Sequence, residues 1–568
     1  MDQTRRLSLH ERPRQTGSVL IVALISILSV AGIAAGTNAL LTQDAVTSTE
    51  HTRQIQGITI ADTFRHWVHD NGYSPSAGNS LAATLYSGND TIGVITEKES
   101  DSKWYNGSAS VGDIEYGYSF SRGAEEIPVT EDLTKAAPGA AKYCQTAIND
   151  SEISIICDLR NESVDFSSPW LINGGTRPVH FEVKLRNTDL TFKDDVVLKG
   201  SDVEIRIEDS RNSPILFEGA LVGGALSGDA ELSIKSLRNR FIKIDEGILI
   251  EGAQATFLLE DIRNMPVEVN GPIVINASES SAEALFKNLQ NRSLTVSGPF
   301  LASGAGAELK VEDFRNTTTT FGDSFTVQGR EGEASTEFKS FINRRLVFRG
   351  NSILEGNNTE FLIEDIRNAQ LKWDKNVEHR AIEEAVFSIQ SMRNKTIDMA
   401  DAFLLTGKKT KMELDDLRNV SASFGTPAVL SAANDSATFA TRSMRNKSTR
   451  LDGDFWIQGQ PAEISLEGLQ WHNTTFDDEI LVAPDDLTII REGSGTLTIG
   501  SDQEFGDYET EAASTEFGAV RRRDASEFAA LIDSEQEPTP TAQEIQNTMD
   551  YPSSGSGGVS SVKRRAVR

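Results

Sequence analysis

The chain has 568 residues and a net charge of −29, with 38% apolar and 7% aromatic residues. A surface this acidic repels nucleic acid and anionic membranes, so neither is expected as the main partner. The modest apolar and low aromatic content fits a thin β-rich fold better than a compact enzyme core. Cys144 and Cys157 are the two cysteines, and in an exported chain they can form one small-loop disulfide; two buried free thiols are the alternative.

The chain begins with a basic segment followed by a long apolar one. Residues 1–17 form a leader with four arginines, and no charged residue occurs between Arg14 and Asp44. A helix over residues 18–41 would be about 36 Å long, enough to cross a bilayer. Because the arginine-rich flank stays cytoplasmic, we expect a single-pass inner-membrane protein whose C-terminal part is periplasmic.

A short basic leader, a glycine and an uninterrupted hydrophobic helix resemble a type IV prepilin, and RQTGSVLIVALISIL resembles the start of PilX-type minor pilins. The resemblance implies prepilin-peptidase cleavage between Gly17 and Ser18, methylation of the new N-terminus, and packing against other pilins through this helix. The fifth mature residue is Val22, where most major pilins have glutamate, which argues against a major pilin. The resemblance covers about residues 12–70. An uncleaved signal anchor and a signal cleaved near Ala34–Gly36 are the alternatives.

The next segment predicts a continuation of this helix. Ile55, Ile58 and Ala61 recur at a spacing of three, so residues 42–72 are predicted to form an amphipathic extension that ends near Gly72. Residues 73–156 mix turn signals with short apolar runs. They predict a small joining domain or a cap for the structure that follows.

An x-Arg-Asn signature then returns every 25 to 27 residues. Within one repeat, the positions seven and five before the asparagine are mostly apolar, which is the alternation of a strand. The step to the apolar position two before it breaks this alternation, so we expect a corner three or four residues before the asparagine. The asparagines are Asn161, Asn187, Asn212, Asn239, Asn264, Asn291, Asn316, Asn343, Asn368, Asn394, Asn419, Asn446 and Asn473.

This period predicts a mainly β fold in which residues 157–502 form a parallel β-helix, or β-solenoid, of about 13 coils of 25–27 residues each. Stacked coils lie about 4.8 Å apart, so the asparagines are expected to form a structural ladder, buried at the corners and bonded to neighbouring coils. The asparagine also suits the left-handed backbone that a tight corner needs.

Charged residues alternate from coil to coil, which supports the stacking. Four residues before the asparagine, the chain alternates acidic and basic residues such as Glu312 and Lys339, and three before it alternates aspartate with serine or asparagine. Opposite charges one strand spacing apart attract, so the alternation indicates register pairing within a double coil of about 52 residues. Residues 503–568, acidic, then Ser/Gly-rich and finally basic, are predicted to be a disordered tail.

No motif for catalysis, a metal or a cofactor stands out; a calcium site on stacked aspartates is an alternative. Trp373, Trp456 and Trp471 are expected mostly in the core. The leading hypothesis is a non-enzymatic minor pilin-like component of a type IV pilus or pseudopilus, which reaches the pilus or cell surface and displays the β-helix for adhesion or assembly priming. A surface glycan or protein is the expected ligand. The alternatives are a membrane-tethered polysaccharide lyase or hydrolase using Asp313 or Asp365, or a structural spacer.

Overall fold

The computed structural model describes residues 80–87, 90–98, 104–111, 114–121, 127–483, 487–505, 510–513, 519–546, 548–549 and 562–566. The predicted leader, the membrane segment 18–41 and the extension 42–72 lie outside these residues. Among the described helices, none is long and apolar enough to span a membrane. The chain divides into two compact units, residues 1–126 with 552–568 and residues 127–551.

The first unit contains a five-stranded antiparallel sheet in the order β1-β2-β3-β4-β47. The last strand comes from the basic C-terminal end, which differs from the disordered tail that the sequence predicts. The strands are β1 (Ser80–Ser87), β2 (Asp90–Lys98), β3 (Trp104–Val111), β4 (Ile114–Ser121) and β47 (Val562–Ala566).

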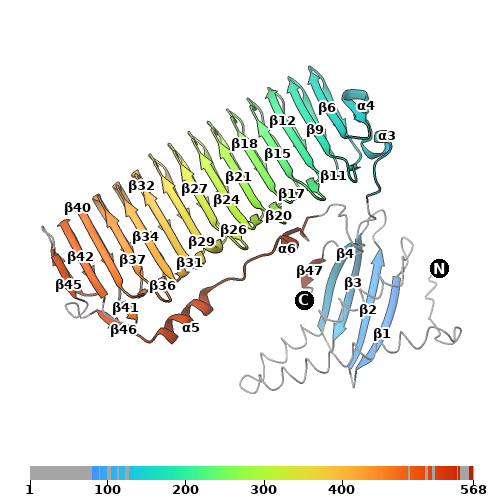
Figure 1. Ribbon diagram of the computed structural model, residues 1–568. Coiled ribbons are helices and arrows are strands. Elements are labelled where there is room, and N and C mark those ends of the chain that lie inside the picture. The colour runs from blue at the N-terminus through green and yellow to red at the C-terminus, as the bar shows by residue number, and fades with distance from the viewer. Residues whose placement is uncertain are drawn as a thin grey trace. The chain divides into compact units, whose positions relative to one another are not determined.

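The second unit is a parallel β-solenoid of about 14 turns, which confirms the predicted parallel β-helix repeat and adds about one turn to it (Figure 1). Each coil contributes three strands, and each strand pairs in parallel with its equivalents in the coils before and after it. The solenoid therefore has three faces, each a continuous parallel sheet. Strands β29 (Ser352–Glu364), β31 (Val377–Gln390) and β40 (Ala462–Phe476) each run through a corner and contribute to two faces.

The first face carries the residues that precede each asparagine, and it contains parts of β29, β31 and β40 together with β6 (Ile153–Arg160), β9 (Val179–Arg186), β12 (Val203–Arg211), β15 (Ala230–Lys235), β18 (Ala255–Glu260), β21 (Ser281–Lys287), β24 (Gly306–Glu312), β27 (Ala334–Lys339), β34 (Lys409–Asp415), β37 (Ala437–Arg442) and β42 (Leu487–Ser494). The second face follows the asparagines and contains the end of β40 together with β7 (Ser163–Phe166), β10 (Asp189–Phe192), β13 (Ile215–Phe217), β16 (Ile242–Ile244), β19 (Val267–Val269), β22 (Ser293–Val296), β25 (Thr318–Phe321), β28 (Arg345–Phe348), β30 (Gln370–Trp373), β32 (Arg393–Met399), β35 (Arg418–Phe424), β38 (Arg445–Leu451) and β43 (Thr496–Ile499). The third face contains the starts of β29 and β31 together with β8 (Trp170–Asn173), β11 (Val196–Gly200), β14 (Leu221–Ala225), β17 (Ile248–Gly252), β20 (Ile273–Ala277), β23 (Phe300–Gly304), β26 (Phe325–Gly329), β33 (Phe403–Gly407), β36 (Ala428–Ala432), β39 (Phe455–Gln458), β41 (Ile480–Ala483) and β46 (Val520–Arg522).

The core runs along the inside of the solenoid and consists of columns of similar side chains, one from each successive coil. On the first face, strands such as β18 and β24 alternate buried and half-buried residues, so every second side chain points inward. On the second face, Phe321, Phe348 and Trp373 stack in successive coils with ring centroids 5.2 Å apart. Such columns bury a large apolar area per coil without helices, and they hold neighbouring coils in register.

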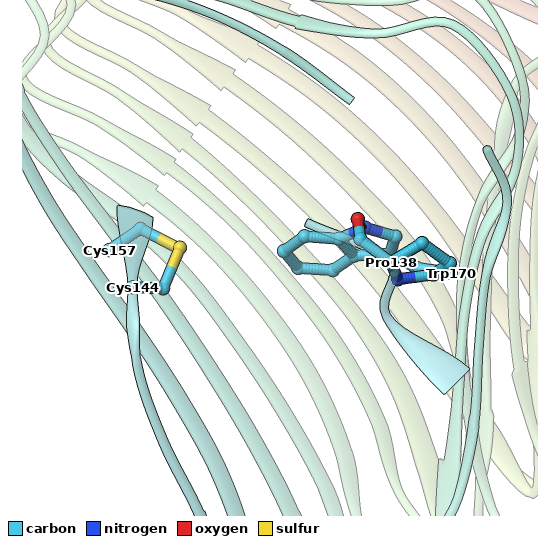
Figure 2. The surroundings of a disulfide bond; sticks show 4 residues. All are labelled: Pro138, Cys144, Cys157 and Trp170. Carbon is cyan, nitrogen blue, oxygen red and sulfur yellow. Dashed lines mark hydrogen bonds between the residues drawn. A yellow bond between two sulfur atoms is a disulfide. The ribbon is translucent and has the colours of Figure 1, made fainter. Parts of the chain in front are cut away.

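Short elements at both ends cover the first and last coils. At the first end, α3 (Leu133–Ala136), α4 (Ala140–Tyr143) and β5 (Gln145–Ile148) precede the solenoid, with β5 antiparallel to β6. The predicted disulfide between Cys144 and Cys157 is confirmed and ties this end to β6; beside it, the Trp170 indole donates to the Pro138 carbonyl at 3.3 Å (Figure 2). At the last end, β44 (Asp502–Phe505) and β45 (Thr510–Ala513) add antiparallel strands. Antiparallel strands therefore cover β6 at the first end and β42 and β43 at the last end.

A C-terminal strap, residues 519–546 and 548–549, runs back along the third face (Figure 1). It begins as β46 in the last coil, continues through α5 (Ala525–Glu535) and ends after α6 (Ala542–Gln546). Phe528 is fully buried against Trp456, at a ring-centroid distance of 5.0 Å. Ile545 and Met549 are buried on the third face of the early coils. The strap differs from the predicted disordered tail because the third face offers it an apolar column of outward side chains.

Candidate functional site: the asparagine corner

The corner between the first and second faces carries the candidate site, defined here as the asparagine corner: residues from three before to one after each laddered asparagine. Each asparagine Nδ2 donates to the Oδ1 of the asparagine one coil earlier, in eleven hydrogen bonds of 2.9 to 3.3 Å. The twelve linked residues are Asn161, Asn187, Asn212, Asn239, Asn264, Asn291, Asn316, Asn343, Asn368, Asn394, Asn419 and Asn446. The thirteenth asparagine of the repeat, Asn473, instead accepts a hydrogen bond from the backbone N–H of Thr496 at 3.0 Å.

The backbone explains why asparagine recurs at this position. All twelve laddered asparagines have φ between 52° and 65°, in the left-handed region that asparagine tolerates best among residues with a Cβ. The aspartate, serine or asparagine three positions earlier has φ between 47° and 59° from Asp209 to Ser443. Two left-handed residues per coil therefore make the corner, near the place where the break in alternation predicts it.

The ladder lies on the surface, whereas the sequence interpretation places it in the interior. All twelve side chains are exposed. The corner's backbone groups bond directly between coils; for example, the N–H of Asn212 donates to the carbonyl of Arg238 at 2.9 Å. Because the backbone needs no side-chain partner, the carboxamides point outward and bond one another. Each carboxamide keeps one N–H donor and acceptor capacity beyond the ladder bonds.

Cations line both sides of the ladder. From Asn212 to Asn446, the residues directly before and after the asparagines include thirteen arginines and lysines and no acidic residue. The cations before the asparagine are Arg211, Arg238, Arg263, Arg315, Arg367, Arg393, Arg418 and Arg445, and those after it are Arg240, Arg292, Arg344, Lys395 and Lys447. On a chain with a net charge of −29, the corner is thus a local basic strip.

Between Asn212 and Asn446, the arginine before the asparagine forms an ion pair in three coils, and each of these coils has an aspartate three positions before the asparagine. Arg367 pairs with Asp365 at 2.8 Å and Arg418 with Asp416 at 2.6 Å, whereas the intervening coils have serine or asparagine in place of the aspartate. The cations after the asparagine also occur only in those intervening coils. They are exposed, and none of them takes part in an ion pair with a described residue. The aspartate before the asparagine and the extra cation after it therefore alternate from coil to coil.

The predicted pairing of charges between coils is also present, on the edge of the first face. Lys287 lies 3.2 Å from Glu312, and Lys339 lies 3.5 Å from Glu364. The hydrogen bond to Glu312 raises the pKa of Lys287. These pairs join acidic and basic residues of the alternating column to each other, and they do not involve the cations that follow the asparagines.

The surface of the corner is open, and two exposed aromatic rings lie close to it in sequence. A recess of about 610 Å³ is lined by Asn239, Arg240, Asn264, Asn291 and Arg292. Phe241, beside this recess in sequence, is 37% exposed. Trp471, two residues before Asn473, is 75% exposed, which corrects the expectation that it belongs to the core. Its positive φ of 51° turns the chain at that point, so the indole faces solvent.

The other two tryptophans lie where apolar side chains are needed. Trp373 is fully buried in the second-face column, and Trp456 is half-buried beneath α5. Sequence spacing alone does not separate them from Trp471, because the last coil departs from the regular repeat.

Titratable groups are also buried on the third face. Burial lowers the pKa of Lys199 to about 8, although the charge of Glu251 opposes the shift. Burial raises the pKa of Glu378, and the neighbouring Arg380 opposes it. The Glu378 carboxylate accepts a hydrogen bond from the Glu537 backbone N–H of the strap at 3.2 Å, and Arg380 donates to Thr539 at 2.8 Å. These polar contacts fix the strap between its two apolar anchors.

Gly17 and Ser18, the predicted cleavage site, lie outside the described residues. Within the described part of the chain, no three His, Cys, Asp or Glu side chains gather so that they could hold a metal ion. Asp313 and Asp365, the residues of the enzyme alternative, are regular members of the corner, 52 residues apart.

Comparison with known proteins gives no match: no family model fits the sequence, and no curated protein or solved structure is significantly similar to it. The fold itself places the chain in the class of parallel β-solenoid proteins.

Proposed function

We propose that this protein is a non-enzymatic, minor pilin-like component of a type IV pilus or pseudopilus that displays its β-solenoid outside the cell for adhesion. The observation that carries the proposal is the asparagine corner, a continuous exposed row of like side chains over twelve coils, flanked by cations. A repeated surface of this kind suits contact with an extended partner. An enzyme, by contrast, concentrates its chemistry in one enclosed place.

Two further features support display outside the cell. The disulfide between Cys144 and Cys157 is a bond that persists in oxidising compartments. The basic leader, Gly17 and the apolar residues 18–41 have the pattern of a prepilin, which would anchor the chain in the inner membrane and then in a filament. Fourteen coils at a rise of about 4.8 Å give a solenoid about 65 Å long, which would project the corner away from its anchor.

The test is the distribution of the full-length chain between filaments and membrane. Cells that assemble type IV filaments are sheared, and the chain is detected with an antibody in the filament fraction and the inner-membrane fraction. We expect the wild-type chain in the filament fraction and a Gly17→Val chain in the membrane fraction only, because the leader is not removed. Equal amounts of both chains in the same fraction would contradict the proposal.

A further inference from the structure

The cations that directly follow the laddered asparagines repeat at a fixed interval along the solenoid. Arg240, Arg292, Arg344, Lys395 and Lys447 are separated by 51 or 52 residues, which is two coils. Two strand spacings correspond to about 9.6 Å. The intervening coils have Met265, Thr317, Ala369 and Val420 at the same position. A ligand that lies along the corner therefore meets added positive charge once per two coils.

The aspartates of the intervening coils repeat with the same two-coil interval. Asp209, Asp261, Asp313, Asp365 and Asp416 also occur once per two coils, in the coils that lack the extra cation. An anionic group placed beside an aspartate is repelled, and one placed beside the extra cation is attracted. The corner therefore favours a polymer whose acidic groups are about two coils apart over one with a charge at every coil.

This interval argues against nucleic acid as the partner. A nucleic acid strand carries one charge about every 3.4 Å in a duplex, so along the corner it would also place phosphates beside the aspartates that recur every two coils. Single strands also bind through rows of aromatic side chains on which the bases stack. Among the described residues, the exposed large aromatic side chains beside the corner are Phe241 and Trp471, which do not form a row.

The ladder itself suits a ligand rich in hydroxyl groups. Within the ladder, each carboxamide donates one N–H and its oxygen accepts one hydrogen bond. Its second N–H can donate to a ligand, and its oxygen can accept a further hydrogen bond. The twelve asparagines thus offer regularly spaced donors and acceptors between the cations. The recess lined by Asn239, Arg240 and Arg292 has room for a sugar ring between two such cations. The exposed indole of Trp471 offers an apolar surface on which a ring can stack.

We propose that the asparagine corner binds a linear acidic polysaccharide, laid along the solenoid axis with one carboxylate per two coils. The carboxylates would meet Arg240, Arg292, Arg344, Lys395 and Lys447 in turn, and the hydroxyl groups would bond the asparagine carboxamides. A glycan with an acidic group on every second sugar has the required spacing. This proposal rests on the proposed adhesive function and names the class of ligand that is bound. The binding itself does not depend on which filament or membrane anchor carries the solenoid.

The test measures binding of the full-length protein, purified in a neutral detergent and immobilised. The probes are hyaluronan, with a carboxylate on every second sugar, polygalacturonate, with one on every sugar, and neutral dextran. We expect hyaluronan to bind more tightly per carboxylate than polygalacturonate, and its affinity to fall as salt is raised. Dextran should not bind measurably. Absence of hyaluronan binding, or tighter binding of polygalacturonate per carboxylate, would overturn the proposal.

Variants test whether the corner makes the contact. The triple variant Arg240→Gln, Arg292→Gln and Arg344→Gln should weaken hyaluronan binding by about tenfold, because three exposed charge contacts are lost. The matched control Arg206→Gln, Lys310→Gln and Lys372→Gln removes the same charge from side chains about 40% exposed that point out of the faces. It should stay within about twofold of wild type. Equal losses in the two triple variants would refute a specific corner site.

A second set of variants alters the spacing without removing a cation. Asp261→Ser, Asp313→Ser and Asp365→Ser place at these corners a residue that the adjacent coils tolerate at the same left-handed position. This variant should bind polygalacturonate several times more tightly and lose its preference for hyaluronan. An unchanged preference would overturn the role of the two-coil interval. These results come from purified protein, so they stand apart from the fate of the filament proposal.

Discussion

His379 is a buried histidine whose replacement by leucine should stabilise the solenoid. The residue lies on β31 and is fully buried; its neighbours at the same position in adjacent coils are Leu354 and Leu405. Its ring lies 5.9 Å from that of Phe361. Neither ring nitrogen has a hydrogen-bond partner of good geometry within the described residues. His379→Leu removes these unsatisfied polar atoms and continues a leucine column, so we expect about 1 kcal/mol of added stability at pH 7.

The advantage of the leucine should grow in acid. Burial lowers the pKa of His379 to about 3 from the ordinary value of 6.5, an effect that the Val386 backbone only partly offsets. Because the unfolded chain takes up the proton more readily, the stability of the wild type falls as the pH falls from about 6.5 towards 3. At about 1.4 kcal/mol per pKa unit, the wild type loses about 2.5 kcal/mol between pH 7 and pH 4.5 through this residue alone. The leucine variant lacks this loss.

Urea unfolding followed by circular dichroism at pH 7 and pH 4.5 measures the difference between the two chains. His472→Leu is a matched control: burial lowers the pKa of His472 to about 4, but its Nε2 lies 3.0 Å from the buried Thr449 hydroxyl. That replacement leaves the hydroxyl without its partner, so it should destabilise the protein at pH 7 while still reducing the acid sensitivity. An advantage of His379→Leu that does not change with pH would refute the reasoning.

Three further predictions concern the ladder, the strap and the disulfide. Asn316→Ala should lower the free energy of unfolding by about 2 kcal/mol, since it removes two ladder hydrogen bonds and places alanine in a left-handed backbone. Asn316→Gly removes the same bonds without the backbone strain, so it should lower the free energy of unfolding by about 1 kcal/mol. Equal losses in urea unfolding would contradict the role given to the left-handed backbone. Phe528→Ala should cost the strap about 3 kcal/mol of packing and make it much more sensitive to limited proteolysis, and unchanged cleavage would show that the buried ring is not its anchor. The variant Cys144→Ala with Cys157→Ala should weaken the first coils by about 2 to 3 kcal/mol, seen as faster hydrogen exchange there and not near the last coil.

The solenoid could be predicted from the sequence because every coil repeats the same pattern of apolar, charged and asparagine residues. The asparagine, the break in alternation before it and the alternating charges each depend on one strand spacing, so their order along the chain gives their order in space. Glu312 beside Lys287 is an example, since 25 residues of sequence become one coil of separation. The sequence does not predict that the ladder is exposed. The direction of the carboxamides depends on which partners form hydrogen bonds with the backbone groups of the corner.

The sequence pattern does not predict the strap, because the strap depends on contact between one face of the solenoid and a segment distant in sequence. A signal was present nonetheless: third-face strands such as β11 and β20 have consecutive apolar residues, where first-face strands alternate. Unbroken apolar runs are typical of strands covered on both sides. The outer side chains Val197 and Val274 are accordingly buried by the strap. The repeat pattern does not identify Ile545 and Phe528 as the residues that cover this face, because the strap does not share the period of the third-face strands.

The start of the mature chain tests the central claim of surface display through a pilin-like anchor most directly. Mass spectrometry of the protein from cells with and without prepilin peptidase would identify the first residue and its modification. We expect a peptide that begins at methylated Ser18 and is lost when the peptidase is absent. A chain that still begins at Met1, or one cut near Gly36, in cells with an active peptidase would contradict it.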